Sequence, residues 1–297
     1  MYADGDALNT VTGPPSPAAR FADMNDRRAL DELFDYARRY RTGSEYQQLL
    51  TFVSGFRFYA PFNAMLVHLQ MDGATYVAPP HRWLREFRRG IRAGARPLVI
   101  LQPMGPVLLV YDVSDTEPLP GAPTLPRHVT DPFTVRAGKI GPKLDMTVHN
   151  ARRDSVSVVE RDAGSQSAGL IRVAAAREPS RYQVFLNIKH APEAKYATLA
   201  HELAHLYCGH IGTLDPRWWP DRRGLSTEAA EIEAESVCYL VCQRLGLDNP
   251  SGEYLSAYLG MDRELPETVS VDRIMKVVGQ IESMACGPLK PRKQGTA

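Results

Sequence analysis

The chain has 297 residues, of which 44% are hydrophobic and 23% are charged, the composition of a globular protein that can bury one large core or two modest ones. Its 35 Lys and Arg residues balance its 34 Asp and Glu residues, so the net charge of +1 gives no global attraction to nucleic acid or membrane. No apolar run approaches the roughly 18–20 residues of a transmembrane helix, and the first residues lack the pattern of a secretory signal. We therefore expect neither a membrane, secreted, collagenous nor wholly disordered protein, but a cytoplasmic one with reduced cysteines.

The sequence of the first part of the chain predicts a tail, four helices and three short strands. Residues 1–24 are rich in Gly, Pro, Ala and Asp without a hydrophobic period, which is typical of a flexible tail. Apolar residues at spacings of three and four then predict a helix from Asp26 that ends at Gly43. Further helices are expected at 45–56, at 61–70 and around Trp83, and strands at 75–77, 97–101 and 107–113.

The second part begins after a proline-rich stretch at 114–132, which is predicted to be a domain linker. Strands are expected at 155–159, 170–174 and 182–188, and helices at 192–208, 227–245, 271–284 and, shorter, 254–259. Strands followed by helices predict an α+β fold. The predicted domains are residues 25–120, with the linker beginning near residue 114, and residues 133–287, before a second tail at 288–297.

The strongest functional signal is the run HELAH at residues 201–205. On an α-helix, positions i and i+4 share one face, so His201 and His205 can bring two imidazoles to one metal ion. Zinc suits two imidazoles with one carboxylate and keeps a fourth position open for water. Glu202 lies beside the histidines, where it can take a proton from that water, whose pKa the ion lowers to about 7. The spacing therefore predicts a catalytic site with one zinc ion.

The alternative to a metal site is a chance match of this pattern on an amphipathic helix. The context favours a metal site, because the motif lies within a strongly helical stretch that Pro192 opens. The run YQVFLNIK at 182–189, which is typical of a strand, comes just before this helix. Metalloproteases of this kind often use such a strand to align the backbone of the substrate, and we expect the same here.

A third ligand is expected from the next helix, which carries the acidic run EIEAE at residues 231–235. Glu231 and Glu235 are four residues apart and share a face, whereas Glu233 points elsewhere. Small and apolar neighbours indicate that part of this helix is buried, and a buried carboxylate needs a cation or hydrogen-bond donors. We assign Glu231 as the third ligand and Glu235 as the residue that holds a ligand histidine through its free ring nitrogen. The opposite assignment, with Glu233 or Glu235 on the metal, stays open.

His210 follows the motif by five residues, beyond Gly209, which is expected to end the helix. The side chain can swing toward the metal, but a histidine in this position more often caps the helix end or lies in solvent, and we expect one of these for His210. Four tyrosines are candidates for stabilising an oxyanion, and the sequence does not choose among them: Tyr207, Tyr239, Tyr254 and Tyr258.

A second signal lies at residues 82–96, RWLREFRRGIRAGAR, which hold six arginines against one glutamate. Arginines bind backbone phosphates, and exposed aromatic rings stack on single-stranded bases. The residues expected to bind DNA are Arg82, Trp83, Arg85, Arg89 and Arg92. The alternative is a solvated helix face whose Trp83 and Phe87, four residues apart, form the stripe that faces the core.

These motifs resemble two known families. HELAH followed by EIEAE is similar to the ImmA/IrrE family of zinc metallopeptidases, in which a downstream E-x-x-A-(N/D/E) pattern supplies the third ligand, and Glu231, Ala234 and Glu235 fit that pattern. Residues 56–120 resemble the N-terminal domain of ArdC-type antirestriction proteins in the runs FYAPFNAMLVHLQ, ATYVAPPHRW, IRAGARPLVIL and VYDVSDTEPLP. The later run EIEAESVCYLVCQRLGL is similar to their metalloprotease domain. One departure is the run RAGAR at 92–96, where ArdC-type proteins have a Lys-Gly-Glu-Lys-like turn.

The resemblance implies an N-terminal α+β domain that binds single-stranded DNA, joined to a zincin-like metallopeptidase domain. The latter would contain a small antiparallel or mixed sheet, the helix with the histidines and the helix with the glutamates. We therefore predict a zinc-dependent endopeptidase of the ImmA/IrrE type that is regulatory and specific for a protein partner such as a transcriptional repressor. The alternative is a non-catalytic or antirestriction-type protein that binds single-stranded DNA and contains a structural metal.

Overall fold

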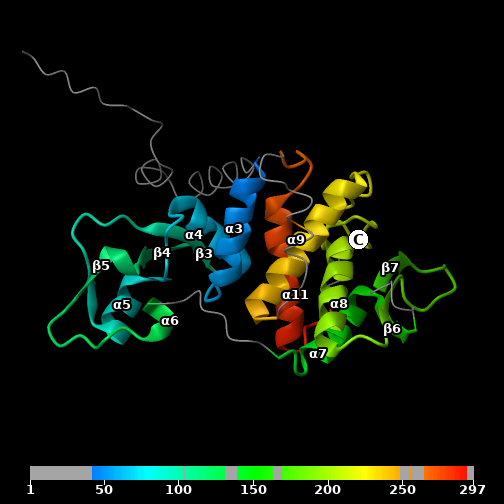
Figure 1. Cartoon of the computed structure of the whole chain (residues 1–297), viewed down its shortest axis with the longest axis horizontal. Helices are drawn as coiled ribbons and strands as arrows, with labels where there is room; N and C mark the ends of the chain where they lie inside the picture. The colour runs from blue at the N-terminus through cyan, green and yellow to red at the C-terminus, as the bar shows by residue number, and fades with distance from the viewer. Residues whose placement is uncertain are drawn as a thin grey trace, which may run out of the picture.

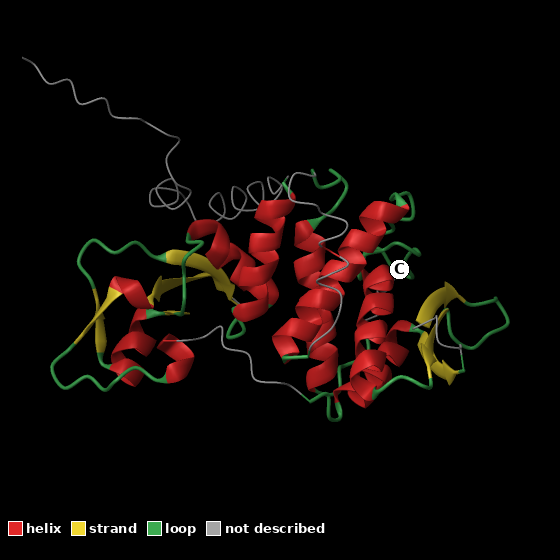
Figure 2. Cartoon of the chain, in the orientation of Figure 1, coloured by secondary structure: helices red, strands yellow, loops and turns green. Residues whose placement is uncertain are grey.

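The computed structural model describes residues 42–102, 105–130, 139–162, 169–247, 255 and 264–292. The predicted tail at 1–24, nearly all of the first predicted helix and almost all of the predicted helix at 254–259 lie outside these residues. Helices occupy the middle of the molecule, and small sheets lie at its two ends (Figures 1 and 2). In the described parts of the chain, no helix has the length and hydrophobicity that crossing a bilayer requires.

Two helices open the described chain. Helix α3 (Gly43–Gly55) begins at a capping box, in which the Thr42 side chain accepts from the backbone of Glu45 and the Glu45 side chain accepts from the backbone of Thr42. Helix α4 (Pro61–Gln70) has a proline in its first turn, where the missing N–H leaves no helical bond unmade. Both match the predicted helices at 45–56 and 61–70 closely.

The N-terminal sheets carry a small core of their own. Strands β1 (Val77–Ala78), β4 (Gly105–Asp112) and β3 (Leu98–Gln102) form an antiparallel sheet in the order β1-β4-β3. Beside it, β2 (Arg89–Ile91) pairs with β5 (Thr116–Pro118), and the short helices η1 (Val113–Asp115) and α6 (Arg127–Thr130) follow β4 and β5. Helix α5 (Pro80–Phe87) covers them, and its Trp83 and Phe87 are buried with Tyr76, Ala78 and Val129.

The C-terminal sheet lies beside helix α8 (Pro192–Tyr207). Its strands β6 (Val156–Arg161), β8 (Tyr182–Asn187) and β7 (Gly169–Val173) stand in the order β6-β8-β7, with β6 parallel and β7 antiparallel to β8. Alternate residues of β8 (Tyr182, Val184 and Leu186) are buried in the core, as the period of a strand requires. Helix α7 (Lys143–Ala151) and the short η2 (Arg152–Asp154) precede the sheet and were not predicted.

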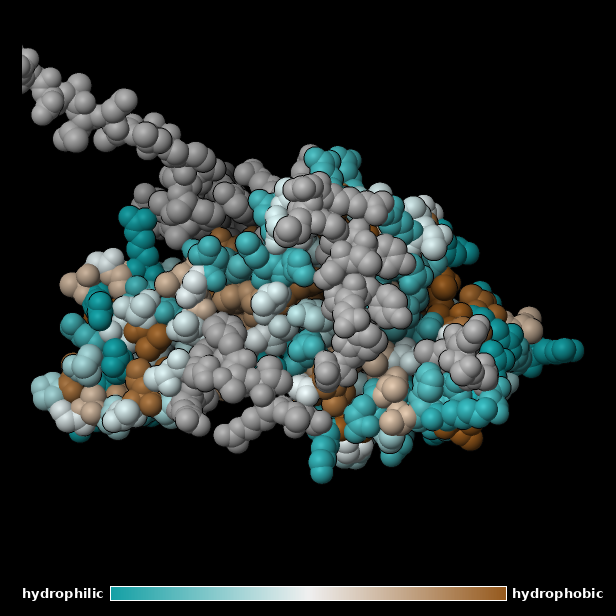
Figure 3. Space-filling view, in the orientation of Figure 1, coloured by the Kyte–Doolittle hydropathy of each residue, from teal (hydrophilic) through white to brown (hydrophobic). Residues whose placement is uncertain are grey.

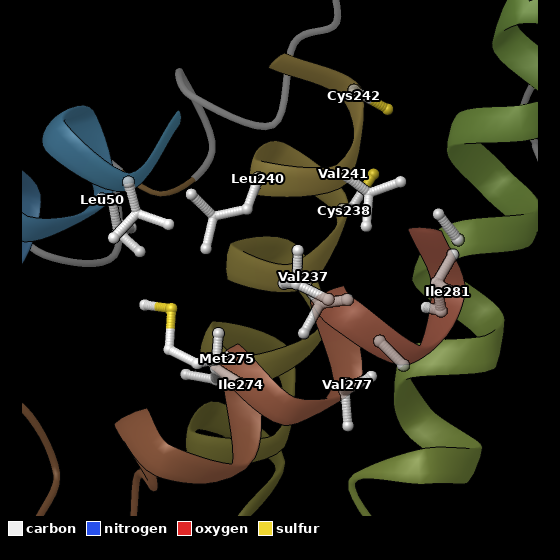
Figure 4. Close-up of a cluster of buried hydrophobic side chains, with 14 of the residues drawn as sticks. Leu50, Val237, Cys238, Leu240, Val241, Cys242, Ile274, Met275, Val277 and Ile281 are labelled. Atoms are coloured by element: carbon white, nitrogen blue, oxygen red, sulfur yellow. The ribbon is translucent and has the colours of Figure 1, made fainter. Parts of the chain in front are cut away.

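One hydrophobic core joins the N-terminal helices to the C-terminal ones. Helices α9 (Thr227–Leu245) and α11 (Val271–Cys286) pack against each other, α9 also packs against α3, and α11 against α4. Figure 4 shows Leu50 of α3 facing the side chains of α9, which in turn meet Ile274 and Met275 of α11. The Tyr46 hydroxyl donates a buried hydrogen bond of 2.7 Å to Ser236 on α9. Helices α3 and α4, predicted as part of the N-terminal domain, thus share the core of the C-terminal part.

The α+β class is confirmed, and the helix predicted at 227–245 has those bounds in the structure. The predicted linker differs, because its first residues form η1 and β5, and β5 pairs with β2 in the register Arg89↔Pro118. Proline is compatible with an edge strand, since the missing N–H then faces away from the partner.

Arg244 of α9 is the polar group that ties α9 to the end of α3. Its guanidinium is buried and donates to the backbone oxygens of Val53 (2.8 Å), Phe56 (2.9 Å) and Tyr59 (2.8 Å). The Nε atom pairs with Glu282 of α11 at 2.6 Å. We predict that Arg244→Met lowers the free energy of unfolding by about 3–5 kcal/mol, because it leaves buried acceptors and one carboxylate without donors. Urea unfolding measures this change.

The matched control for this prediction is Arg85→Met. The Arg85 side chain is 73% exposed, and its ion pair with Glu86 is 3.2 Å long. Exposed ion pairs contribute little, so we expect a change below about 0.5 kcal/mol. Equal effects of the two substitutions would contradict the role of Arg244.

Candidate metal centre

Helices α8 and α9 bring three predicted ligands together. The Nε2 atoms of His201 and His205, one turn apart on α8, are separated by 3.1 Å. Glu231, on the first turns of α9, places one carboxylate oxygen 3.6 Å from Nε2 of His201 and the other 3.6 Å from Nε2 of His205. Helix α9 is fixed at this end by Ser226, whose side chain accepts from the backbone of Ala229.

These separations suit one tetrahedral ion. Zinc binds imidazole nitrogen and carboxylate oxygen at about 2.0–2.2 Å, which in a tetrahedral site places neighbouring ligand atoms about 3.3–3.6 Å apart. The observed separations of 3.1–3.6 Å span that value. Two imidazoles with one carboxylate is also one of the donor sets found in catalytic zinc sites. The residues present therefore fit a zinc ion without movement of the backbone.

Burial decides the charge states around this cluster. It lowers the pKa of His205 to about 3, with contributions from His201 and His210, and it also lowers the pKa of His201. Both imidazoles are thus neutral near pH 7, which is the form that binds a metal. Burial also raises the pKa of Glu202 to about 7, and the negative charges of Glu231 and Glu235 act in the same direction.

Glu202 lies beside the cluster and next to the sheet. Its side chain is buried, and it forms a hydrogen bond with the backbone of Ile171 on β7. Helix α8 contacts β7 directly, because Gly169 leaves no side chain between the strand and Thr198. The carboxylate is therefore held between the metal ligands and an edge strand of the sheet.

The three glutamates of the acidic run have different surroundings. Glu235 places Oε1 3.4 Å from Nδ1 of His201, the ring nitrogen that faces away from Glu231. Glu233 is fully buried elsewhere and pairs with Arg222 and His210. With these partners it is not available as a ligand of the cluster formed by His201, His205 and Glu231.

Two positions were expected for His210, at the cap of the helix or in solvent. The backbone N–H of His210 does cap the end of α8. The imidazole is not in solvent, because the side chain is only 5% exposed and contacts His205 and Glu233. Of the tyrosines considered for an oxyanion, Tyr207 is fully buried and donates to Asp154, which removes it from the set. Tyr254 and Tyr258 lie outside the described residues.

The strand expected to align a substrate also needs correction. That run forms β8, which is the central strand and is paired on both sides, by β6 and by β7. Its backbone has no open edge for a further strand. The strand that lies at the edge of the sheet, and that contacts both α8 and Glu202, is β7.

The predicted DNA-binding residues divide into three groups. Trp83 is fully buried, and its ring N–H donates to the backbone oxygen of Tyr111, so it cannot stack on a base and that assignment is wrong. Arg89 and Arg92 both donate to Thr116, which ties β2 to β5. Arg82 and Arg85 lie at the surface, where both pair with Glu86.

The segment that contains the cluster matches a known family of protein domains. Residues 151–242 match the model of the IrrE N-terminal-like domain, of the M78 family of peptidases. This segment runs from the end of α7 through the sheet and α8 into α9, and so includes every residue of the candidate site. Neither a curated protein nor a solved structure matches the chain. The matched segment begins at residue 151 and does not include residues 56–120, whose resemblance to ArdC-type proteins stays a prediction.

Gly209 determines how the chain leaves α8, and so where His210 lies. It has a φ of +90°, and a Cβ built on it would lie 2.1 Å from the backbone oxygen of Pro220. We predict that Gly209→Ala lowers the free energy of unfolding by about 1–3 kcal/mol or more, because the left-handed conformation and the clash both oppose a side chain. Thermal unfolding measures this loss.

Gly224→Ala is the control, because nothing lies within 4 Å of its Cβ position. A melting temperature of Gly209→Ala equal to that of Gly224→Ala would contradict the tight approach of the chain at residues 209 and 220.

Proposed function

We propose that the chain is a zinc-dependent endopeptidase in which His201, His205 and Glu231 hold the ion and Glu202 acts as general base. The observation that carries the proposal is the convergence of the three ligand atoms to separations of 3.1–3.6 Å beside a buried carboxylate. The peptidase family model at residues 151–242 supports the same reaction class. Glu235 orients His201 through its second ring nitrogen.

The chemistry follows from what each group can do. When bound, a zinc ion supplies a Lewis acid that polarises the scissile carbonyl and makes water acidic enough to react near pH 7. Glu202 takes the proton from the attacking water and returns it to the leaving amine. Its hydrogen bond with Ile171 fixes the carboxylate between the ligands and β7, so the proton acceptor is oriented before a substrate arrives.

The edge strand β7 is the element that we propose to align a peptide substrate. In the described residues it pairs with β8 alone, so its other side is open to a further strand. Leu170 and Val173 of β7 are partly exposed, and Figure 3 shows hydrophobic side chains at the surface of the end of the molecule that carries this sheet. An extended segment of a protein partner, such as a transcriptional repressor, fits this edge.

Metal content and activity test the proposal together. We predict that the wild-type protein binds about one zinc ion per chain, and that His201→Ala loses most of it because two ligands do not retain the ion. Glu202→Gln keeps the metal but loses peptide cleavage by about 10²-fold or more, because the amide cannot accept a proton. Elemental analysis measures the metal, and cleavage of an unfolded protein or peptide library measures the activity.

Glu228→Gln is the matched control, since Glu228 lies on the first turn of α9 outside the cluster. It should change neither quantity. Full activity of Glu202→Gln would rule out the general-base role, and a wild-type protein without zinc would rule out the metal site.

A second proposal concerns single-stranded DNA. We propose that the arginines at the surface around β2 bind backbone phosphates, and the supporting observation is that Arg85, Arg88 and Arg96 are all exposed there. Phosphate contacts need exposed cations. Arg89 is partly buried, and Arg92 is exposed, but both donate to the backbone oxygen of Thr116, so we leave them out of the proposal. Base stacking on Trp83 has no part in this proposal.

Salt dependence tests the DNA proposal. We predict that the double variant Arg85→Ala/Arg96→Ala binds a single-stranded oligonucleotide more weakly and reduces the slope of log K against log salt by about 1.4, because each lost phosphate contact removes about 0.7. Fluorescence anisotropy measures binding at several salt concentrations.

The control replaces two exposed lysines elsewhere, Lys189 and Lys276, whose side chains are 60% and 53% exposed. It removes the same charge from other surfaces. Equal slopes in the two double variants would show that binding reflects net charge alone and would remove the arginines from the proposal.

A further inference from the structure

The end of α8 returns the chain to His205. The N–H of Gly209 donates to the backbone oxygen of Leu206 (2.9 Å), and the N–H of His210 donates to that of His205 (2.9 Å). This is the hydrogen-bond pattern of a Schellman motif, and Gly209 supplies the left-handed residue that it requires. The motif therefore places His210 next to the turn of helix that carries His205.

The side chain of His210 contacts the ring of His205 as well. The Nδ1 atoms of the two imidazoles are 2.9 Å apart, while Nε2 of His210 lies 3.0 Å from Oε2 of Glu233. His205 directs its other nitrogen, Nε2, toward His201 and Glu231. His210 thus connects the far side of one predicted ligand to a buried carboxylate.

Metal binding fixes where the protons of this chain of groups lie. An imidazole that gives the lone pair of Nε2 to an ion carries its proton on Nδ1. His205 then donates from Nδ1 to Nδ1 of His210, which must be the acceptor. The proton of His210 consequently lies on Nε2 and is donated to Glu233.

Glu233 is held in place on every side. Its Oε1 accepts from Nη2 of Arg222 and from the backbone N–H of Ser270, both at 2.7 Å, and its Oε2 accepts from Nη1 of Arg222 at 2.7 Å and from His210. Burial alone would raise the pKa of Glu233, but the hydrogen bonds from His210, Arg222 and Ser270 outweigh burial and lower it. Glu233 is therefore a fixed negative charge.

We propose that His210 is a positioning residue for the metal centre, which holds the ring of His205 in the orientation and tautomer that bind zinc and is itself held by Glu233 and Arg222. The inference rests on the zinc site of the proposed function. In this proposal His210 orients the ring of His205 through its Nδ1 atom, as Glu235 orients the ring of His201. Each ligand histidine then has its own orienting residue.

The same atoms could be read as a second metal site, since ligand atoms of Cys208, His210 and Glu233 lie within 4.8 Å of one another. The contacts of Glu233 argue against it. A carboxylate offers about four lone pairs, and the four donors described above use them. The neighbouring guanidinium of Arg222 also opposes a cation at this place.

The zinc affinity of purified variants tests the proposal, measured by competition with a chromophoric chelator. His210→Ala should weaken zinc binding about 10–100-fold, the usual effect of losing a group that orients a ligand. His210→Asn should bind nearly as tightly as the wild type, because its amide oxygen can accept from Nδ1 of His205. Equal affinity of wild type and His210→Ala would overturn the proposal, and so would equally weak binding by His210→Asn and His210→Ala.

Ser236→Ala is the matched control on α9. It removes the buried hydrogen bond with Tyr46, so it should lower the melting temperature while leaving the zinc affinity unchanged. A parallel loss of zinc affinity in Ser236→Ala and His210→Ala would show that both act through general stability and would overturn the positioning role.

The tautomers provide a readout that needs no substitution. In the ¹⁵N spectrum of the zinc-loaded wild type, the proton should lie on Nδ1 of His205 and on Nε2 of His210. A proton on Nδ1 of His210 would overturn the proposal, as would two zinc ions per chain of which His210→Ala loses one. A wild type that binds no zinc would instead refute the proposed function, so the two failures are distinguishable.

Discussion

The packing of α8 on α9 is the constraint on which the candidate site depends. The two helices contact each other directly, and Sγ of Cys238 on α9 lies 3.3 Å from the backbone oxygen of Ala197 on α8. This packing lets the single side chain of Glu231 on α9 reach both imidazoles of α8. The same packing brings the carboxylates of Glu202, Glu231 and Glu235 together around the partly buried imidazoles. Burying carboxylates without a counter-charge is unfavourable. The zinc ion of the proposed site would remove that repulsion, so the ion and the site would stabilise each other.

The parts of the site that the sequence could predict are those set by helix geometry. The spacing of His201 and His205 places both on one face of α8 whatever the rest of the chain does, and the bounds of α9 followed from its apolar pattern. Helix geometry alone does not predict the position of His210. That position depends on the left-handed conformation of Gly209 and on its close approach to Pro220, a residue of another turn. The glycine-histidine pair just past the helix was the available signal, since it fits the end of a Schellman motif.

The wrong predictions concern features that depend on how distant segments pack, namely the burial of a side chain and the order of strands in a sheet. The spacing of Trp83 and Phe87 fits a core stripe and an aromatic binding face equally well, and only the packing of Tyr76 and Val129 on that stripe decides for the core. Strand order is likewise not set by local sequence: β8, the strand nearest to the motif in sequence, is the centre of the sheet, and β7 is one of its two edges. The family match covers residues 151–242, yet their core includes Tyr46 and other side chains of α3 that lie far away in sequence. Domain boundaries predicted from sequence patterns alone therefore place α3 and the C-terminal helices in different domains, although they share one core.

The acidic run on α9 shows how one helix gives neighbouring glutamates different tasks. Two residues correspond to a rotation of about 200° around a helix, so Glu233 faces away from Glu231 and Glu235. The side toward α8 has imidazoles as partners, and the opposite side has Arg222 and the start of α11. His210 bridges the two sides, because it contacts His205 on one and Glu233 on the other. The charge of Glu233 is balanced by Arg222 of the chain itself, whereas in the proposed zinc site the carboxylate of Glu231 would be balanced by the ion.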